Sequence, residues 1–136
     1  MKNYELLVQK IIKVDSKELI DEITIDFLNK VNSVKNRKAM VRCMLRGSRT
    51  NYAILKYFAR FTANINQYFK DYSQDLNQAL IDEYNILQKD DKLTNIDERM
   101  RNLRFICELL KFDIYPMTHF LEILKKYIFN LFIIIG

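Results

Sequence analysis

Residues 99–112 of this chain read RMRNLRFICELLKF, and apolar side chains cover most of the circumference when this stretch is drawn as a helix. Such a helix is stable only when neighbours cover it on more than one side. We therefore predict a central helix, either of a stacked helical array or of an ordinary bundle. The narrow polar wedge that remains consists of Arg101, Arg104, Glu108 and Lys111. Within it we expect Arg104 and Glu108 to pair with each other or with the adjacent helix.

The rest of the chain is also predicted to be helical. Only two glycines and one proline interrupt 136 residues, and low contents of both residues are typical of mostly helical proteins. Ser16 is predicted to cap one helix and Gly47 to terminate another. Short links between amphipathic helices favour antiparallel neighbours. We expect seven helices: about residues 4–13, 17–32, 35–46, 51–69 and 72–88, a sixth starting after Thr94 or Asn95, and a seventh starting near Met117 or Thr118.

The central stretch also carries a resemblance. Residues 102–112, NLRFICELLKF, resemble the helix that marks the middle domain of eukaryotic translation initiation factor four-gamma and its relatives. Further stretches agree in order: LIDEITIDFLNKVN at 19–32, NRKAMVR at 36–42, ILKYFARFTANI at 54–65 and DLNQAL at 75–80. Within this family the sequence is most similar to nonsense-mediated mRNA decay scaffolds, and to the second of their three middle-type domains. The residues that carry the structural marker are Arg104, Phe105, Ile106, Glu108 and Leu109.

The resemblance covers about residues 6–127 and implies a fold. It implies an all-α, HEAT-like α-solenoid of antiparallel helix pairs, here truncated after about seven helices. We therefore expect residues 1–136 to form a single partial domain. The chain ends in the apolar sequence LFIIIG, the opposite of a polar solenoid cap. Residues 129–136 are accordingly predicted to be a disordered tail or non-native coding sequence. One departure is Cys107, where relatives usually carry Gly or Ala.

The charge is unevenly distributed along the chain. The net charge is +5, and no acidic residue lies between Phe27 and Lys70, a stretch that holds ten basic residues. Five of them fall within about a quarter-turn of one helix face. An ordinary solvated face remains one interpretation, and a site for an acidic protein partner or for an RNA backbone is the other. We favour the acidic partner because no aromatic residues alternate with these charges. The five residues are Lys35, Lys38, Arg42, Arg46 and Arg49.

Residues that could support catalysis are scarce. His119 is the only histidine and is predicted to be an ordinary residue of a helix face. Cys43 and Cys107 lack metal-site spacing and an activating histidine, so we expect free thiols in a reducing compartment. With two glycines, no phosphate-binding loop is expected. We predict no enzyme, no metal site, no cofactor and no small-molecule substrate.

The expected function follows from the resemblance. It implies a non-enzymatic scaffold in nonsense-mediated mRNA decay whose partners are other mRNA-surveillance proteins: a helicase, its kinase and the exon-junction-bound factor. A second middle-type domain would have a chiefly architectural role. A translation-initiation scaffold that binds RNA and a helicase, and a cap-binding or splicing relative, remain alternatives. The apolar tail from Ile128 is shorter than the ~20 residues that span a bilayer, so we expect no membrane partner. The expected location is the cytoplasm, including its perinuclear region.

Overall fold

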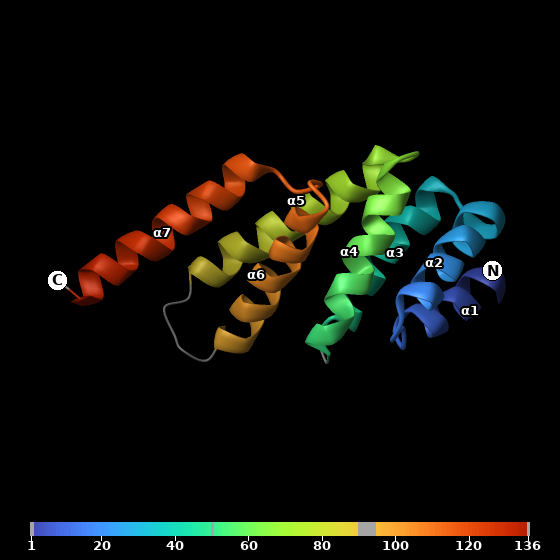
Figure 1. Ribbon diagram of the computed structural model, residues 1–136, viewed down its shortest axis with the longest axis horizontal. Helices are drawn as coiled ribbons and strands as arrows, with labels where there is room; N and C mark the ends of the chain where they lie inside the picture. The colour runs from blue at the N-terminus through green and yellow to red at the C-terminus, as the bar shows by residue number, and fades with distance from the viewer. Residues whose placement is uncertain (1, 50, 90–94, 136) are drawn as a thin grey trace.

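The computed structural model describes residues 2–49, 51–89 and 95–135, and the described residues form helices and no strand. An all-α fold was predicted, and it is confirmed. Figure 1 shows the helices following one another along the long axis of the molecule. The helices are α1 (Lys2–Ile11), α2 (Lys17–Asp26), α3 (Val34–Gly47), α4 (Leu55–Asn66), α5 (Lys70–Gln88), α6 (Ile96–Lys111) and α7 (Met117–Ile135), with a π-helical turn η1 (Phe27–Val31) and a 3-10 turn η2 (Tyr52–Ile54).

The helices stack in two layers. α2, α4 and α6 contact one another in succession, and α1, α3 and α5 do the same in the second layer. Contacts of α1 with α2, of α4 with α5 and of α5 with α6 join the layers. This arrangement of neighbouring helix pairs is that of a HEAT-like solenoid, as the sequence indicated.

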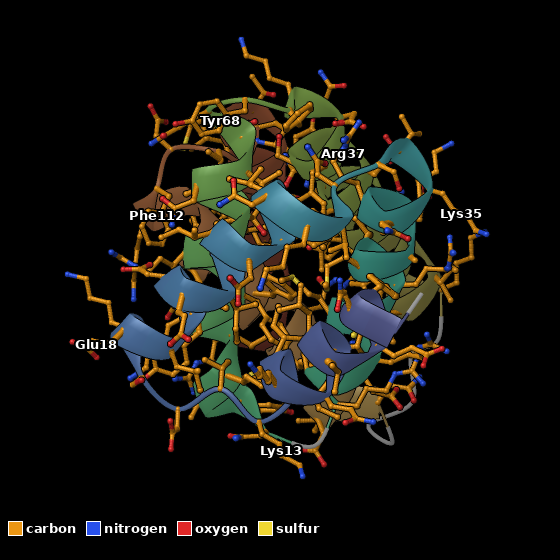
Figure 2. All side chains as sticks on the ribbon, turned by 90° about the vertical axis from the view of Figure 1, so that its right-hand side faces the viewer. Lys13, Glu18, Lys35, Arg37, Tyr68 and Phe112 are labelled. Carbon is orange, nitrogen blue, oxygen red and sulfur yellow. The ribbon has the colours of Figure 1, made fainter. Side chains whose placement is uncertain are left out.

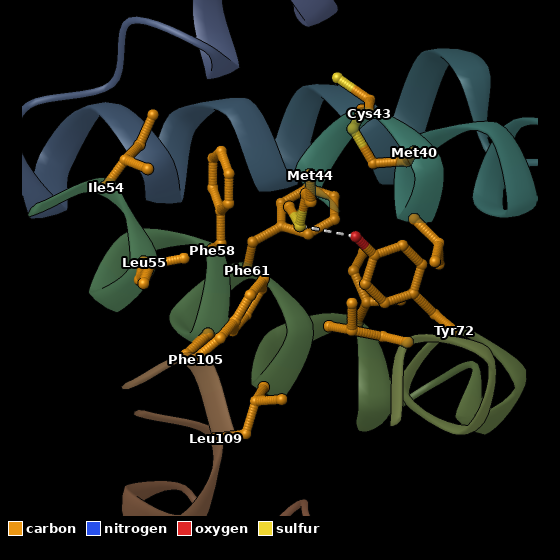
Figure 3. Packing of buried hydrophobic residues seen from close by; sticks show 14 of the residues in the cluster. Met40, Cys43, Met44, Ile54, Leu55, Phe58, Phe61, Tyr72, Phe105 and Leu109 are labelled. Atoms are coloured by element: carbon orange, nitrogen blue, oxygen red, sulfur yellow. Dashed lines mark hydrogen bonds between the residues drawn. The ribbon is translucent and has the colours of Figure 1, made fainter. Parts of the chain in front are cut away.

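Aromatic side chains from several helices form the centre of the core (Figure 3). The Phe61 ring of α4 makes T-shaped contacts with Phe27 and with Tyr72, each at 5.5 Å between ring centroids. The buried Tyr72 hydroxyl donates to Met44 Sδ of α3 at 2.8 Å, and burial raises the pKa of this hydroxyl well above its ordinary value. The protonated hydroxyl therefore keeps a partner inside the core. The Phe105 ring of α6 approaches Phe58 of α4 at 6.4 Å.

Helix α6 occupies the central position predicted for it. Phe105, Ile106 and Leu109 are buried, and the helix packs against both α4 and α5. Apolar side chains at the start of the helix remain outside this contact, with Ile96 49% and Met100 56% exposed, and Phe112 just beyond the helix is 38% exposed. The helix is therefore covered on two sides and open to solvent on a third.

Of two predicted helix-end residues, one is confirmed and the other is wrong. Ser16 caps α2 as predicted, accepting a hydrogen bond from Leu19 N at 3.1 Å. Gly47, however, is the last residue of α3 rather than a left-handed residue beyond it. The prediction was wrong because Ser48 closes the helix end: its N–H bonds to Met44 O at 3.1 Å and its hydroxyl to Leu45 O at 3.0 Å. No left-handed residue is needed there.

The second predicted helix is divided. Residues 17–32 were expected to form one α-helix, but α2 ends at Asp26 and continues as the π turn η1. At the end of α2 the Phe27 N–H is shared between the carbonyls of Ile23 and Thr24. Phe27 is fully buried against Phe61. Short π segments of this kind occur within α-helices and leave no clear sequence signal.

Helix α7 makes less contact with the array than the other helices. Ile123 is buried, and His119 packs edge-on against Tyr84 of α5 at 5.7 Å. Tyr115 Oη and His119 Nδ1 share a hydrogen bond at 2.6 Å, so the histidine is a packing residue. In Figure 1 the far end of α7 points away from the array. Its exposed apolar residues are Met117, Leu121, Leu124, Tyr127, Ile128 and Phe129.

The C-terminal tail remains a prediction. The backbone of α7 is helical to Ile135, whereas the side chains of residues 130–135 and the whole of Gly136 lie outside the described residues. Whether residues 129–136 are disordered or non-native is therefore still a hypothesis. Within the described residues, no helix combines the length and the hydropathy needed to cross a membrane.

We expect the exposed side of α7 to cause self-association, because large exposed apolar patches drive proteins together. Replacing Leu124 and Phe129 by serine should raise the monomer fraction in sedimentation at micromolar concentration. Both side chains are exposed, so the free energy of unfolding should change by no more than about 0.5 kcal/mol each. Ile86→Ser, at an exposed position on α5, is the matched control and should not change the association. A wild-type chain that sediments as a monomer for days contradicts this prediction.

Candidate docking surface on α3

Helix α3 presents the predicted basic residues on one side. Ser33 caps the helix, accepting from Asn36 N at 3.1 Å, and Asn36 Nδ2 donates to Val31 O at 2.7 Å, which fixes the start of α3 against η1. In Figure 2 Lys35 lies at the outer edge of α3. All five predicted residues are exposed, four on α3 and Arg49 just beyond it, and we call them the basic face: Lys35, Lys38, Arg42, Arg46 and Arg49.

The opposite side of α3 anchors the basic face. Met40, Val41 and Met44 are buried in the core. Arg37 also turns inward, and its Nε donates to both carboxylate oxygens of Asp71 at 3.1 and 3.0 Å. Its Nη1 donates to Asn32 Oδ1 at 2.6 Å, and its guanidinium lies 4.3 Å from the centre of the Phe69 ring. α3 is therefore held in a fixed rotation, which fixes the direction of the basic face.

Acidic residues approach the basic face from α5. A hollow of about 330 Å³ between α3 and α5 is lined by Lys38 and Arg42 on one wall and by Asp75 and Asp82 on the other. The sequence analysis did not anticipate this mixture, because these acidic residues lie more than thirty positions further along the chain. On this side the basic face is partly balanced by negative charge.

The charged neighbours of Arg49 differ from those of the other four residues. It lines a separate hollow of about 270 Å³ with Glu83, Glu98 and Arg101. Arg101 Nη2 and Glu83 Oε2 are 3.5 Å apart in an ion pair between α6 and α5. Arg49 is thus surrounded by mixed charges, and the structure does not join it to a continuous positive surface.

A third hollow, of about 490 Å³, lies on the other side of α3, against α1. The sequence analysis missed it, although the helical spacing of Val8 and Ile12 was an available signal. Among the residues that the structure describes, no acidic side chain lines this hollow. The lining residues are Val8, Ile12, Lys13, Cys43, Arg46 and Gly47, and we call it the α1–α3 hollow.

Both cysteines are free thiols, as predicted. Burial raises the pKa of the Cys43 thiol, which keeps it protonated near neutral pH. Burial, together with the nearby Glu108 carboxylate, also raises the pKa of the Cys107 thiol. Neither thiol is therefore set up as a nucleophile, and Cys107 fits its partly buried position as a small apolar residue.

The polar wedge of α6 is paired differently from the prediction. Glu108 Oε1 accepts from Lys111 Nζ at 3.0 Å, whereas Arg104 is exposed, so the predicted Arg104–Glu108 pair is wrong. An acidic residue that precedes its basic partner along a helix is the favourable order, and Lys111 satisfies it where Arg104 does not. The expected pairing with an adjacent helix is made instead by Arg101, with Glu83 of α5.

Among residues 2–49, 51–89 and 95–135, no three His, Cys, Asp or Glu side chains come together as a metal site. Asp71 contacts Arg37, and Asp82 accepts a hydrogen bond from Gln78. Asp90 and Asp91 lie outside the described residues.

Comparison with known proteins agrees with the helical array. Residues 5–131 match the family model described as "MIF4G domain". The chain is 38% identical over 114 residues to "Regulator of nonsense transcripts UPF2" from Arabidopsis thaliana, an alignment covering 84% of this chain and 10% of that protein. It is 29% identical over 122 residues to "Regulator of nonsense transcripts 2" from Mus musculus and from Homo sapiens, covering 89% of this chain and 10% of each relative. The chain thus spans about a tenth of the length of these curated relatives. The two-layer array of helices and the match over residues 5–131 show that the chain belongs to the MIF4G domain family.

Proposed function

We propose that this chain is a non-enzymatic scaffold domain of a nonsense-mediated mRNA decay factor, and that it corresponds to the second of three MIF4G domains in that factor. The names of its relatives support the pathway and favour it over translation initiation. The helical array and the unactivated thiols support binding rather than catalysis. The proposed location is the cytoplasm.

The exposed basic face of α3 is the observation that carries the proposed mode of action. Its arginine and lysine side chains point to solvent on a helix that the core holds in a fixed rotation. We propose that it docks an acidic segment of another mRNA-surveillance protein. Complementary charge of this kind guides association and selects among partners.

An acidic protein segment suits this surface better than RNA. A phosphate backbone carries continuous negative charge and would meet Asp75 and Asp82 beside Lys38 and Arg42. Binding of single-stranded RNA also uses exposed aromatic rings for base stacking. The strongly exposed Tyr68 lies beyond the end of α4, in hollows formed with α2 and η1 rather than with α3.

The test is a double charge reversal, Arg42→Glu with Arg46→Glu, measured against a panel of the surveillance helicase, its kinase and the exon-junction-bound factor. We expect at least one partner to bind the wild-type chain and to lose about tenfold or more in affinity to the variant, because like charges would then face each other. Lys89→Glu with Lys125→Glu changes the same charge at exposed positions away from α3 and should have a small effect.

Titration of labelled RNA at two salt concentrations tests the alternative, that the basic face binds RNA instead of an acidic protein segment. Phosphate contact would appear as RNA affinity that falls steeply with salt and is lost in the Arg42→Glu, Arg46→Glu variant. The proposal fails if that variant, folded by circular dichroism, binds every member of the panel as the wild type does. The proposal also fails if the basic face binds RNA and none of the proteins in the panel.

A further inference from the structure

We propose that the α1–α3 hollow is the specificity pocket of this docking surface and that it receives the apolar side chains of an acidic amphipathic helix. This inference rests on the proposed function, because it names the kind of segment that the basic face selects. It adds a second requirement, an apolar contact, to the charge contact already described.

The floor of the α1–α3 hollow is apolar and accessible. Val8 is half-buried and Ile12 is 43% exposed, so both present hydrocarbon to an incoming side chain. Gly47 adds no side chain to the floor. A Cβ at Gly47 would lie 3.6 Å from Ile12 Cγ2 and 3.5 Å from Phe58 Cζ, so any residue larger than alanine would begin to fill the space. The volume of about 490 Å³ falls in the range of ligand pockets, about 300–1,000 Å³.

The rim of the α1–α3 hollow is positive. Lys13 follows the end of α1, Arg46 lies in the last turn of α3, and both are exposed. Arg42 and Arg46 also lie close enough to Tyr4 of α1 to counteract part of the rise that burial causes in its pKa. Positive charge therefore extends along the α1 side of α3, above an apolar floor.

The α3–α5 hollow provides a contrast within the same molecule. It lies in the same layer and is lined by Lys38 and Arg42 of the basic face, but Asp75 and Asp82 form its other wall and its volume is about 330 Å³. A carboxylate entering it would face two carboxylates. An acidic segment is therefore expected to bind on the α1 side of α3, where none of the described side chains that line the hollow is acidic.

The form of the ligand follows from the groove between two neighbouring helices. An amphipathic helix places apolar residues at i, i+3, i+4 and i+7 along one stripe, which suits the apolar floor formed by Val8 and Ile12. Glutamate or aspartate on either side of that stripe would reach Lys13 and Arg46. The proposed ligand is therefore a helix with an aliphatic stripe bordered by carboxylates.

Two labelled synthetic peptides of equal length and charge test the proposal on the full chain. One carries leucine at i, i+3, i+4 and i+7 among glutamates, and the other carries serine at those positions. We expect the leucine peptide to bind the wild-type chain about tenfold or more tightly than the serine peptide in fluorescence anisotropy, since burial of leucine side chains away from water favours binding. Ile12→Ser should remove most of that difference.

The control variants locate the binding. Leu6→Ser removes an apolar side chain of α1 that is 55% exposed and does not line the hollow, so it should change the affinity less than twofold. Leu124→Ser tests the exposed side of α7 as a rival apolar surface and should also leave the affinity unchanged. Loss of leucine-peptide binding in either control, with Ile12→Ser unaffected, overturns the proposal.

The peptides also separate this inference from the proposed function. One outcome is that the Arg42→Glu, Arg46→Glu variant binds both peptides more weakly than the wild type, while the wild-type chain binds the two peptides equally. In that case the basic face docks acidic segments, but the α1–α3 hollow does not select apolar side chains. If that double variant weakens neither peptide, the docking function itself fails. Absence of measurable binding of the leucine peptide, or tighter binding of single-stranded RNA at the same salt, also overturns the inference.

Discussion

Replacing Ile106 by aspartate should abolish the cooperative thermal unfolding of this chain. Ile106 is fully buried in α6, which packs against both α4 and α5. The substitution would place an unpaired carboxylate in the core beside apolar neighbours, with an expected cost of more than about 4 kcal/mol. Native domains are stable by only about 5–15 kcal/mol, so most of the free energy of unfolding would be lost. Circular dichroism during heating measures the result.

Met100→Asp is the matched control for this prediction. It introduces the same charge on the same helix at a side chain that is 56% exposed, so its effect should stay within about 0.5 kcal/mol. The central position of α6 is contradicted if Ile106→Asp keeps a cooperative melt close to that of Met100→Asp. Equal and severe losses in both variants would instead show that any aspartate in this helix is disruptive.

Replacing Arg37 by alanine should cost about 2–4 kcal/mol, the second-largest effect that we expect. Its guanidinium joins three parts of the fold: Asn32 at the end of η1, Phe69 in the link between α4 and α5, and Asp71 at the start of α5. Only 9% of the Arg37 side chain is exposed, whereas 40% of Asp71 is exposed and can regain water in the variant. The loss should therefore lie below that of Ile106→Asp.

Two further substitutions test whether the geometry of Arg37 matters. Arg37→Lys keeps the charge but cannot reproduce the contacts that the guanidinium makes with the Asp71 carboxylate and with Asn32, so it should recover only part of the lost stability. Lys35→Ala removes an exposed basic side chain from the same helix and should be nearly neutral. Chemical denaturation gives the free energy of unfolding for each. Equal stability of Arg37→Ala and Lys35→Ala would show that the cluster does not stabilise the fold.

Much of the fold could be predicted from local signals. The apolar stripe of α4 and the wide apolar surface of α6 indicated burial because helical periodicity determines which side chains share a face. Phe58 and Phe105 accordingly meet in the core. Ser16 caps α2 through a bond that depends only on neighbouring residues.

The features that were missed have both long-range and local causes. The π turn at Phe27 is associated with packing against Phe61 of α4. Helix α3 ends through the bonds of Ser48 instead of a left-handed glycine. Glu108 pairs with Lys111 rather than with Arg104, and the acid-before-base order that favours this pair was already present in the sequence.

The candidate site could be predicted only in part. The sequence correctly indicated that the five residues of the basic face are exposed, but a stretch without acidic residues does not make an uncompensated positive surface. Arg60 Nε and Nη2 contact both carboxylate oxygens of Asp21 at 2.7 and 2.9 Å, and these hydrogen bonds hold the pKa of Asp21 below its ordinary value. Arg37 likewise pairs with Asp71, which lies just beyond residues 27–70, the stretch without acidic residues. Which basic residues remain available is decided by the packing of helices that are remote in sequence.

The most direct measurement of the central claim, that the basic face of α3 docks an acidic segment, is a map of backbone amide chemical shifts. The isotope-labelled chain would be titrated with the surveillance partner that binds it in the panel. We expect the largest changes in α1 and α3, around Ile12, Arg42 and Arg46, with little change at Tyr68 or along α7. Changes centred on α7, or on the surface of α2 and α4 near Tyr68, would contradict the account.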